Sequence, residues 1–206
     1  CAADHKALLE APGAHEMPLV VLPDGTVLKC PTEQQLAHRL GLYPNLDPDH
    51  VYDVAIVGAG PAGLATAVYA ASEGLSAIVL DTRVIGGQAG ASSRIENYLG
   101  FPTGISGQAL AGRAFVQAQK FGAEIMIPAK AASLDCSEAG ERGIVSLRLE
   151  DGRRLRSRTV VIASGAHYRR PAVTRLGDFE GKGVSYWASA LEAKTCTAAE
   201  VVGIDP

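Results

Sequence analysis

The sequence has little of what would assign it to a specialised class of protein. Aromatic residues make up only 5% of its 206 residues, so the core must consist mainly of Val, Leu, Ile and Ala. No apolar run reaches the roughly 18 residues of a membrane-spanning helix, so we predict no membrane partner. The remaining composition is that of an ordinary globular protein of one or two domains.

Cysteines are few and far apart. They stand at positions 1, 30, 136 and 196. No two are spaced as a CxxC redox pair or a zinc knuckle, so we predict no metal site. Scattered thiols fit a reducing cytoplasm better than a disulfide scaffold, and we expect a cytoplasmic protein. We expect Cys196 to be a small buried hydrophobic residue, although it could instead be redox-active with a partner outside this chain, and we expect Cys136 to be structural.

A dense block of basic residues is also lacking, and the formal net charge is −3. Arg153, Arg154, Arg156 and Arg158 do lie close together, after the turn residues Asp151-Gly152. We interpret them as the solvated face of a hairpin, with a nucleic-acid patch as the alternative. We therefore predict no nucleic-acid partner.

The first 50 residues differ from the rest in charge, with a balance of −4 against +1 for the remainder. "PLVVLPDGTVLKC" (18–30) predicts a hairpin around a Pro-Asp-Gly turn. Thr32 then caps a predicted helix that ends near Gly41. The polar, proline-containing segment 44–50 predicts a linker.

From residue 51 the pattern predicts a strand, a glycine turn, a helix and a second strand. The strands are 52–57 and 76–80, and the helix is 61–73. Parallel strands joined in this way imply an α/β fold. A long loop (82–106) follows, and then come a helix that Ser106 caps and strands near 123–134, 143–149 and 155–162.

The turn carries three glycines in the spacing GxGxxG: Gly58, Gly60 and Gly63. The first allows a sharp turn, the second leaves room for a pyrophosphate, and the third lets helix and strand pack closely. The helix N-terminus offers free amides to an anion. Asp81 ends the next strand, where a carboxylate can accept hydrogen bonds from ribose. We predict a dinucleotide, FAD or NAD(P); the alternative is a turn that binds nothing.

Further segments resemble the FAD-binding half of thioredoxin reductase, a flavoprotein disulfide reductase with two dinucleotide-binding folds. These are "GAGPAGLATAVYAASEGL", "GGQAGASSRIENYLGFPTGISGQAL", "QAQKFGAEI" and "TVVIASGA", and the match runs from about Val51 to Tyr186. The resemblance implies a Rossmann-like FAD/NAD(P)-binding fold: a parallel sheet with a helix layer and a three-stranded β-meander. We expect it to be incomplete, after a short α+β N-terminal piece.

The resemblance also implies the cofactor-binding residues. Those that would cradle the FAD pyrophosphate are Gly58, Ala59, Gly60, Pro61 and Ala62. Asp81 would hold the adenosine ribose.

On the flavin side, Gly86, Gly87 and Gln88 would run beside the phosphate and ribityl chain, and Asn97 would bond near the flavin. Ala163, Ser164 and Gly165 would approach the FAD from a strand end. As alternatives, Gln88 and Asn97 are ordinary loop residues, and Ala163 to Gly165 are a plain turn between elements.

The tail departs from the family pattern. After "GVSY" thioredoxin reductases carry a Cys-x-x-Cys pair, but here Trp187 and Ala190 stand at the two cysteine positions, with Ala188 and Ser189 between them. Neither can form a disulfide, so this exit for electrons is lacking. No second GxGxxG follows, so we expect the NADPH site to lie outside this chain. We identify no catalytic acid, base or nucleophile.

Four segments follow from these patterns: the tail of a thioredoxin-like module (1–43), a linker (44–50), the first part of an FAD-binding domain (51–171) and the start of an NAD(P)H-binding domain (172–206). Met17-Pro18 before a strand carries the thioredoxin-like resemblance, and an ordinary edge-strand proline is its alternative. We expect a fragment of a homodimeric parent that has a thioredoxin-like module or partner, and we expect the isolated fragment to retain FAD weakly or not at all.

The leading functional hypothesis is an NAD(P)H-dependent flavoprotein oxidoreductase that delivers electrons to a disulfide or to another acceptor. The second is a flavin- or nucleotide-binding regulatory module without turnover, because the cysteine pair is replaced. The third is a plain NAD-dependent dehydrogenase that uses the first turn alone.

Overall fold

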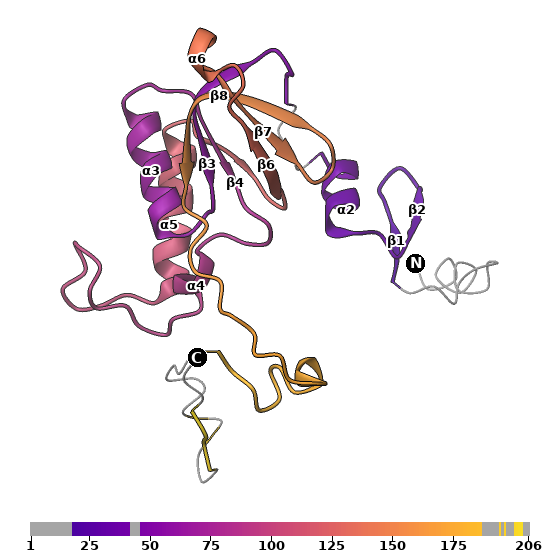
Figure 1. Ribbon diagram of the computed structural model, residues 1–206, viewed down its shortest axis with the longest axis vertical. Helices are drawn as coiled ribbons and strands as arrows, with labels where there is room; N and C mark the ends of the chain where they lie inside the picture. The colour runs from indigo at the N-terminus through magenta and orange to yellow at the C-terminus, as the bar shows by residue number, and fades with distance from the viewer. Residues whose placement is uncertain (1–17, 42–45, 187–193, 195, 197–199, 204–206) are drawn as a thin grey trace.

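The computed structural model describes residues 18–41, 46–186, 194, 196 and 200–203. Figure 1 shows a main α/β body, a small unit before it and a segment that leaves it toward the C-terminus. The main body is organised around one six-stranded sheet.

The centre of the sheet is a βαβ unit. Strand β3 (Val51–Val57) leads into helix α3 (Pro61–Ser72), which returns to strand β4 (Ala77–Leu80). The two strands are parallel, with Val54 opposite Ala77. Every residue of β4 is buried, as expected of a central parallel strand that is covered on both faces. The predicted βαβ unit is confirmed, with boundaries shifted by one residue at most.

Two more strands extend the parallel part of the sheet. Helix α5 (Gly107–Lys120) leads to β5 (Glu124–Met126), which pairs parallel with β4. On the other side, β8 (Arg154–Ile162) pairs parallel with β3. The carboxyl ends of β3, β4 and β8 therefore meet at one edge of the sheet, where ligands of open α/β sheets bind.

An antiparallel part completes the sheet. Strands β6 (Ala131–Asp135) and β7 (Val145–Leu149) are joined through the short helix α6 (Ala139–Arg142), and β7 pairs with the first half of β8. These strands form the predicted three-stranded β-meander. The strand expected near 123–134 is instead two strands at opposite ends of the sheet order, separated at Pro128, which has no backbone N–H to continue a ladder.

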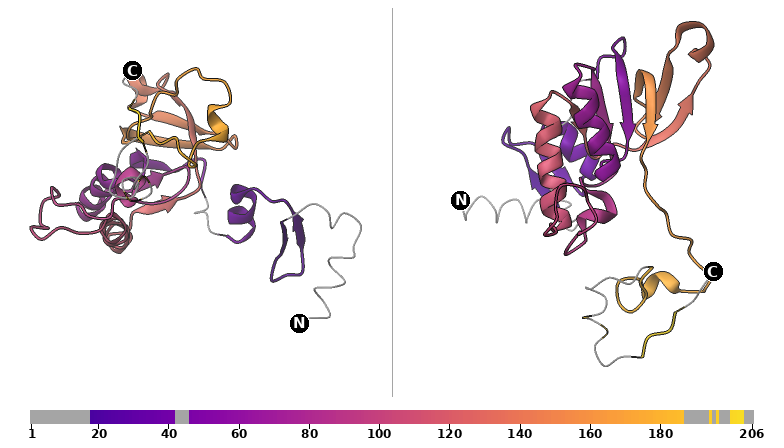
Figure 2. Two further views of the ribbon diagram at one scale, coloured as in Figure 1. Left: turned by 90° about the horizontal axis from the view of Figure 1, so that it is seen from below. Right: turned by 90° about the vertical axis from the view of Figure 1, so that its left-hand side faces the viewer.

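Each face of the sheet has its own hydrophobic core. Helices α3 and α5 cover one face (Figures 1 and 2), where Ile56, Val79 and Leu64 are fully buried. The other face packs against the meander through residues such as Ile78 and Leu155. Alternate residues from Val54 to Val57 of β3 and along β4 belong to the two cores, so these stretches are apolar throughout.

Two polar contacts hold the amino-terminal half of β3. The Tyr52 hydroxyl donates to Glu124 at 2.9 Å, and burial together with this bond raises the pKa of Tyr52. The Asp53 carboxylate accepts from the backbone amide and the hydroxyl of Ser76 at 2.9 and 2.8 Å. These two bonds, with a smaller effect of Arg158, lower the pKa of Asp53. The first contact ties β3 to β5, two strands away in the sheet, and the second ties it to the residue before the adjacent strand β4.

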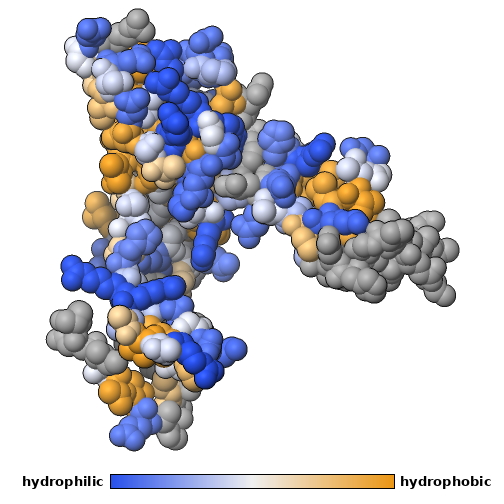
Figure 3. All heavy atoms as spheres, turned by 45° about the vertical axis from the view of Figure 1, so that its right-hand side comes forward, coloured by the Kyte–Doolittle hydropathy of each residue, from blue (hydrophilic) through white to orange (hydrophobic). Residues whose placement is uncertain are grey.

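The N-terminal unit contains the predicted hairpin and helix. Strands β1 (Leu19–Val21) and β2 (Val27–Lys29) pair antiparallel, and α2 (Glu33–Arg39) follows. Thr32 forms a capping box with Gln35, as its predicted capping role requires. Figure 3 shows hydrophobic residues on the surface of this unit. Val21 in β1 is 50% exposed.

The segment after β8 contains one turn of 3₁₀-helix, η1 (Leu176–Asp178). The right-hand view of Figure 2 shows the segment extending away from the sheet. Cys196 is partly exposed, so the prediction that it is buried is wrong, and Cys136 is exposed. Among the described residues, no helix has the length and apolarity to span a bilayer, and no cluster of His, Cys, Asp and Glu is suited to a metal ion.

Candidate dinucleotide-binding site

The glycine turn joins the carboxyl end of β3 to the amino end of α3. Gly58 has φ +113°, and its N–H donates to the Leu80 carbonyl at 2.7 Å. A Cβ at this position would lie 2.2 Å from the Ala163 carbonyl oxygen. The fold itself therefore requires glycine at position 58.

Gly63 is required for a related reason. It is buried in the first turn of α3, and a Cβ there would lie 1.8 Å from the carbonyl oxygen of Gly58. Only a residue without a side chain lets the helix approach the end of β3 this closely.

Gly60 differs from both. Its φ of −73° and ψ of −178° are open to any residue, and no protein atom lies within 4 Å of the position of an added Cβ. Neither conformation nor packing within the described chain explains this glycine. A ligand that approaches the backbone closely would explain it, because a Cβ would occupy the ligand's space.

The amino terminus of α3 points into this space. Pro61 occupies the first turn of the helix, no side chain caps it, and the first turn contains no acidic residue. The amides of Ala62 and Gly63 thus lie at the positive end of a 12-residue helix without a competing side-chain acceptor. This arrangement favours a phosphate group.

Asp81 lies beside the turn, at the carboxyl end of β4. Its carboxylate accepts from the backbone amide of Ala59 at 2.7 Å and from that of Arg83 at 3.0 Å. These bonds use one lone pair on each oxygen and leave the second for another donor, such as a ribose hydroxyl.

The loop after β4 returns to the glycine turn through a short helix, α4 (Gly87–Gly90), which sequence analysis missed. The Gly86 amide donates to the Ala59 carbonyl at 2.7 Å, and a Cβ on Gly87 would lie 3.3 Å from the Gly60 Cα. Gly86 and Gly87 have φ of +96° and +52°. The backbones of the two segments are therefore in direct contact.

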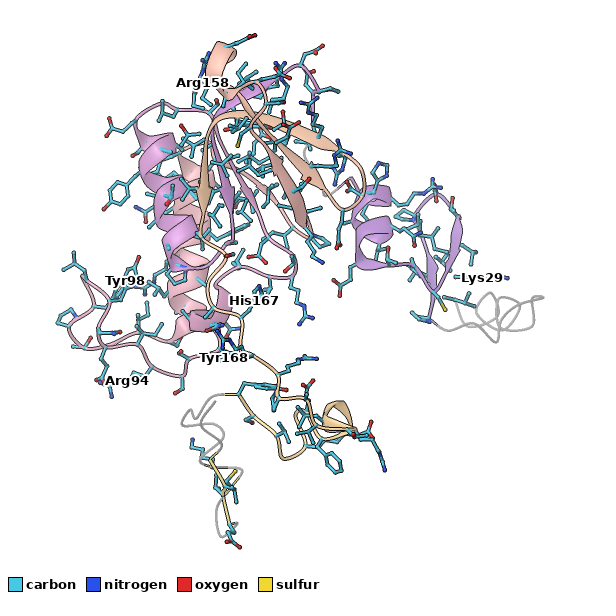
Figure 4. The ribbon with its side chains drawn as sticks, in the orientation of Figure 1. Lys29, Arg94, Tyr98, Arg158, His167 and Tyr168 are labelled. Atoms are coloured by element: carbon cyan, nitrogen blue, oxygen red, sulfur yellow. The ribbon has the colours of Figure 1, made fainter. Side chains whose placement is uncertain are left out.

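The third side of the site comes from the end of β8. The Ala163 amide donates to the Val57 carbonyl at 2.8 Å, which sets residues 163–165 against Gly58. The next residues contact α4: Gln88 Nε2 donates to the Ala166 carbonyl at 2.6 Å, and the Tyr168 hydroxyl donates to Gln88 Oε1 at 3.3 Å. Figure 4 shows Tyr168 next to α4.

Asn97 is placed differently. It is an exposed residue of a loop whose base is closed by hydrogen bonds between Ile95 and Ile105, and whose side is held by an Arg94–Glu96 ion pair at 2.9 Å. Arg94 and Tyr98 lie in this projecting loop in Figure 4. In the described part of the chain, no hydrogen bond or ion pair connects this loop to the glycine turn.

We call the open space beside the glycine turn, α4 and the end of β8 the crevice. Hollows of about 580 and 680 Å³ lie elsewhere. One is between α2 and the turn after β7, and the other is along α5. A long ligand could lie across the crevice, with the glycine turn under its centre, Asp81 toward one end and α4 toward the other.

The family model for pyridine nucleotide-disulphide oxidoreductase matches residues 52–202. The chain belongs to this family. Its match covers the whole of the sheet described above, including all three sides of the crevice. The pyridine nucleotide-disulphide oxidoreductase fold is Rossmann-like, as predicted.

Individual relatives support the assignment. The chain is 39% identical over 139 residues to thioredoxin reductase from Aquifex aeolicus and 35% identical over 143 residues to that from Bacillus subtilis. These matches cover 68% and 69% of this chain but 42% and 43% of the relatives. The chain thus spans less than half the length of these relatives.

Solved structures agree. Thioredoxin reductase from Lactococcus lactis, in its FR conformation, superposes with a TM-score of 0.58 at 28% identity, covering 68% of this chain and 43% of that one. Thioredoxin reductase from T. acidophilum gives 0.56 at 32% identity, covering 66% and 42%. The family resemblance inferred from sequence motifs is confirmed.

The structure brings together most of the site residues that the sequence predicts. These are Gly58, Ala59, Gly60, Pro61, Ala62, Asp81, Gly86, Gly87, Gln88, Ala163, Ser164 and Gly165. Asn97 is not joined to them, and Trp187 to Ala190 lie outside the described residues. Sequence analysis did not single out Tyr168, because only its hydrogen bond to Gln88, 80 residues away, places it beside the site.

Proposed function

We propose that this chain is the FAD-binding portion of an oxidoreductase that passes electrons from NAD(P)H through FAD to an acceptor. FAD, when bound, supplies the capacity to take up a hydride and release electrons. The residues of the chain bind and orient it. The whole protein's activity would resemble that of thioredoxin-disulfide reductase, except at the acceptor side.

The observation that supports this proposal most strongly is the open position at Gly60. The fold explains Gly58 and Gly63 by close backbone contacts, whereas Gly60 has free space. In this proposal the FAD pyrophosphate occupies that space and accepts from the amides at the start of α3. Asp81 would hold the adenosine ribose.

The flavin half of the cofactor would lie toward α4 and the end of β8. Gly86, Gly87 and Gln88 would flank the ribityl chain, and Ala163 to Gly165 would approach from the opposite side. Asn97 would contact the flavin only with a change in its loop, because that loop projects away from α4.

The acceptor is the least constrained part of the proposal. Trp187 and Ala190 cannot form a disulfide, so electrons would leave through cysteines elsewhere in the whole protein, or to an acceptor that needs no cysteine. The same substitution motivates a second candidate, a flavin-binding regulatory module without turnover. Steady-state NADPH oxidation by a protein that contains this chain and a nicotinamide site separates the two.

The N-terminal unit fits a modular protein. Its order of hairpin and helix matches the last part of a thioredoxin-like module, which would occupy residues 1–43, ahead of a linker at 44–50. Residues 51–171 would form the first part of the FAD domain, and 172–206 would begin the NAD(P)H domain. We further propose a cytoplasmic homodimer for the whole protein.

The direct test is an equilibrium titration, because weak binding escapes co-purification. FAD is titrated with the chain while flavin fluorescence and visible absorbance are recorded, and NAD⁺ is titrated in parallel by calorimetry. Binding of FAD, with a perturbed flavin spectrum, supports the proposal. Binding of NAD⁺ alone indicates a plain dehydrogenase turn, and binding of neither contradicts a dinucleotide site.

A further inference from the structure

The segment that leaves β8 has no hydrophobic anchor of its own. Residues 164–175 are exposed at every position. Their location therefore depends on polar contacts and ring contacts, not on burial. The first such contacts along the segment are those of Ala166 and Tyr168 with Gln88.

Both groups of the Gln88 amide are used, and their orientation is unambiguous. The Ala166 carbonyl can only accept, so it must face Nε2, which leaves Oε1 for the Tyr168 hydroxyl. The bonds are 2.6 and 3.3 Å long and span 78 and 80 residues of sequence. One side chain thus bridges α4 and two positions of the departing segment.

The contacts continue toward the C-terminus. The Tyr168 ring stacks on Tyr186, with centroids 6.5 Å apart and an interplanar angle of 16°. The Tyr186 hydroxyl donates to Glu180 at 2.5 Å, and Arg170 forms an ion pair with Glu180 at 3.2 Å. Residues 180–186 are therefore linked back to Gln88 through Tyr168.

On its other side, Gln88 is directly connected to the glycine turn. It follows Gly86 and Gly87. The Gly86 amide donates to the Ala59 carbonyl, and the Gly87 backbone packs against that of Gly60. A ligand that contacts both Gly60 and Gly87 would restrict α4, and a restricted α4 would restrict Gln88.

We propose that Gln88 is a positioning residue that couples occupancy of the dinucleotide crevice to the direction in which residues 166–186 leave the sheet. This inference rests on the proposed function, since the ligand is FAD. By linkage, a ligand that favours the bridged arrangement is itself bound more tightly when the bridge can form.

Limited trypsin digestion tests the bridge. Trypsin can cleave the Arg169–Arg170 bond, which lies next to the bridge, whereas the Arg170–Pro171 bond resists cleavage. The rate at Arg169 is divided by the rate at Arg39, an exposed residue at the end of α2, so that differences in protease activity and protein concentration cancel. The variants are Gln88→Ala, Gln88→Glu, which cannot donate to Ala166, and Tyr168→Phe. Gln119→Ala, at an exposed position of α5, is the matched control.

Without FAD, we expect the ratio to rise about three- to tenfold in Gln88→Ala and Gln88→Glu, less in Tyr168→Phe, and not at all in Gln119→Ala. An unchanged ratio in both Gln88 variants would overturn the bridge. In the wild type, FAD should lower the ratio, and this effect should be lost in the Gln88 variants at FAD concentrations that saturate each of them. FAD that binds without changing the wild-type ratio would overturn the coupling.

The two proposals fail separately. If the chain does not change the FAD spectrum, the proposed function and the coupling are both contradicted. The ratio measured without FAD still decides whether Gln88 holds the segment.

Discussion

Three glycines of one turn meet different physical needs. Gly58 and Gly63 contact backbone atoms so closely that a methyl group would overlap them, at 2.2 and 1.8 Å. A methyl group added at Gly60 would have no protein atom within 4 Å. The sequence pattern alone treats the three as one motif, and only the geometry separates the two glycines that the fold requires from one that it does not.

This separation predicts distinct effects on stability. Gly58→Ala and Gly63→Ala should each lower the free energy of unfolding by about 2 kcal/mol or more, through strain and overlap. Urea denaturation followed by circular dichroism measures the loss. A change below about 0.5 kcal/mol, typical of surface substitutions, would show that the turn relaxes and that the fold does not need these glycines.

A pH-dependent effect is expected at Asp53. Hydrogen bonds from Ser76 lower the pKa of Asp53 in the folded protein. The ionised carboxylate therefore stabilises the fold fully above its unfolded pKa of about 3.9, and this stabilisation is lost as the pH falls through the lower folded value. Asp53→Asn should be less stable than wild type at pH 7, and the difference should shrink below about pH 4.

Urea midpoints between pH 7 and pH 2.5 measure this difference. Ser76→Ala removes the hydroxyl donor but keeps the backbone one, so it should show part of the same pH dependence. A difference between Asp53→Asn and wild type that is constant with pH would contradict the assignment.

At the scale of elements, local signals predicted most of the fold. The helix start at Ser106 is an example: its hydroxyl accepts from the Ala109 amide at 3.2 Å, as expected of a cap. The Thr32 cap and the order of strand, glycine turn and helix after residue 51 were predicted from local signals in the same way. Each of these features depends on residues a few positions apart.

The cap gives a direct prediction. Ser106→Ala should lower the free energy of unfolding by about 1 kcal/mol, because an amide of the first turn of α5 loses its acceptor. Ser93→Ala, at an exposed loop position, is the control and should change it by less than about 0.5 kcal/mol. Equal stability of the two variants would mean that solvent replaces the cap.

Elements that depend on distant contacts were missed. Helix α4 has four residues and follows a left-handed glycine, so neither periodicity nor a capping side chain marks it. It is positioned by bonds to Ala59 and Ala166, which are 27 and 78 residues from Gly86 and Gln88, respectively. The break of the predicted strand at Pro128 shows the opposite case, since a local signal was present and was not used.

At the scale of the whole molecule, the sheet collects the ends of three strands and the start of one helix into a single crevice. The family and its Rossmann-like fold could be predicted from the order of motifs, because that order determines which strand ends meet. The position of Asn97 and the path after β8 could not, because both depend on exposed segments with few contacts. Figure 3 shows hydrophobic side chains on this outer segment, where Phe179 is 53% exposed.

The central claim is that the space above Gly60 is reserved for the pyrophosphate of FAD. The most direct measurement is the dissociation constant of FAD for wild type, Gly60→Ala and Gly112→Ala, each with its free energy of unfolding. Gly112 also has free space, but on α5. We predict that Gly60→Ala keeps its stability within about 0.5 kcal/mol and loses at least about tenfold in FAD affinity, while Gly112→Ala binds FAD as wild type does. A Gly60→Ala protein that binds FAD as tightly as wild type would contradict the account.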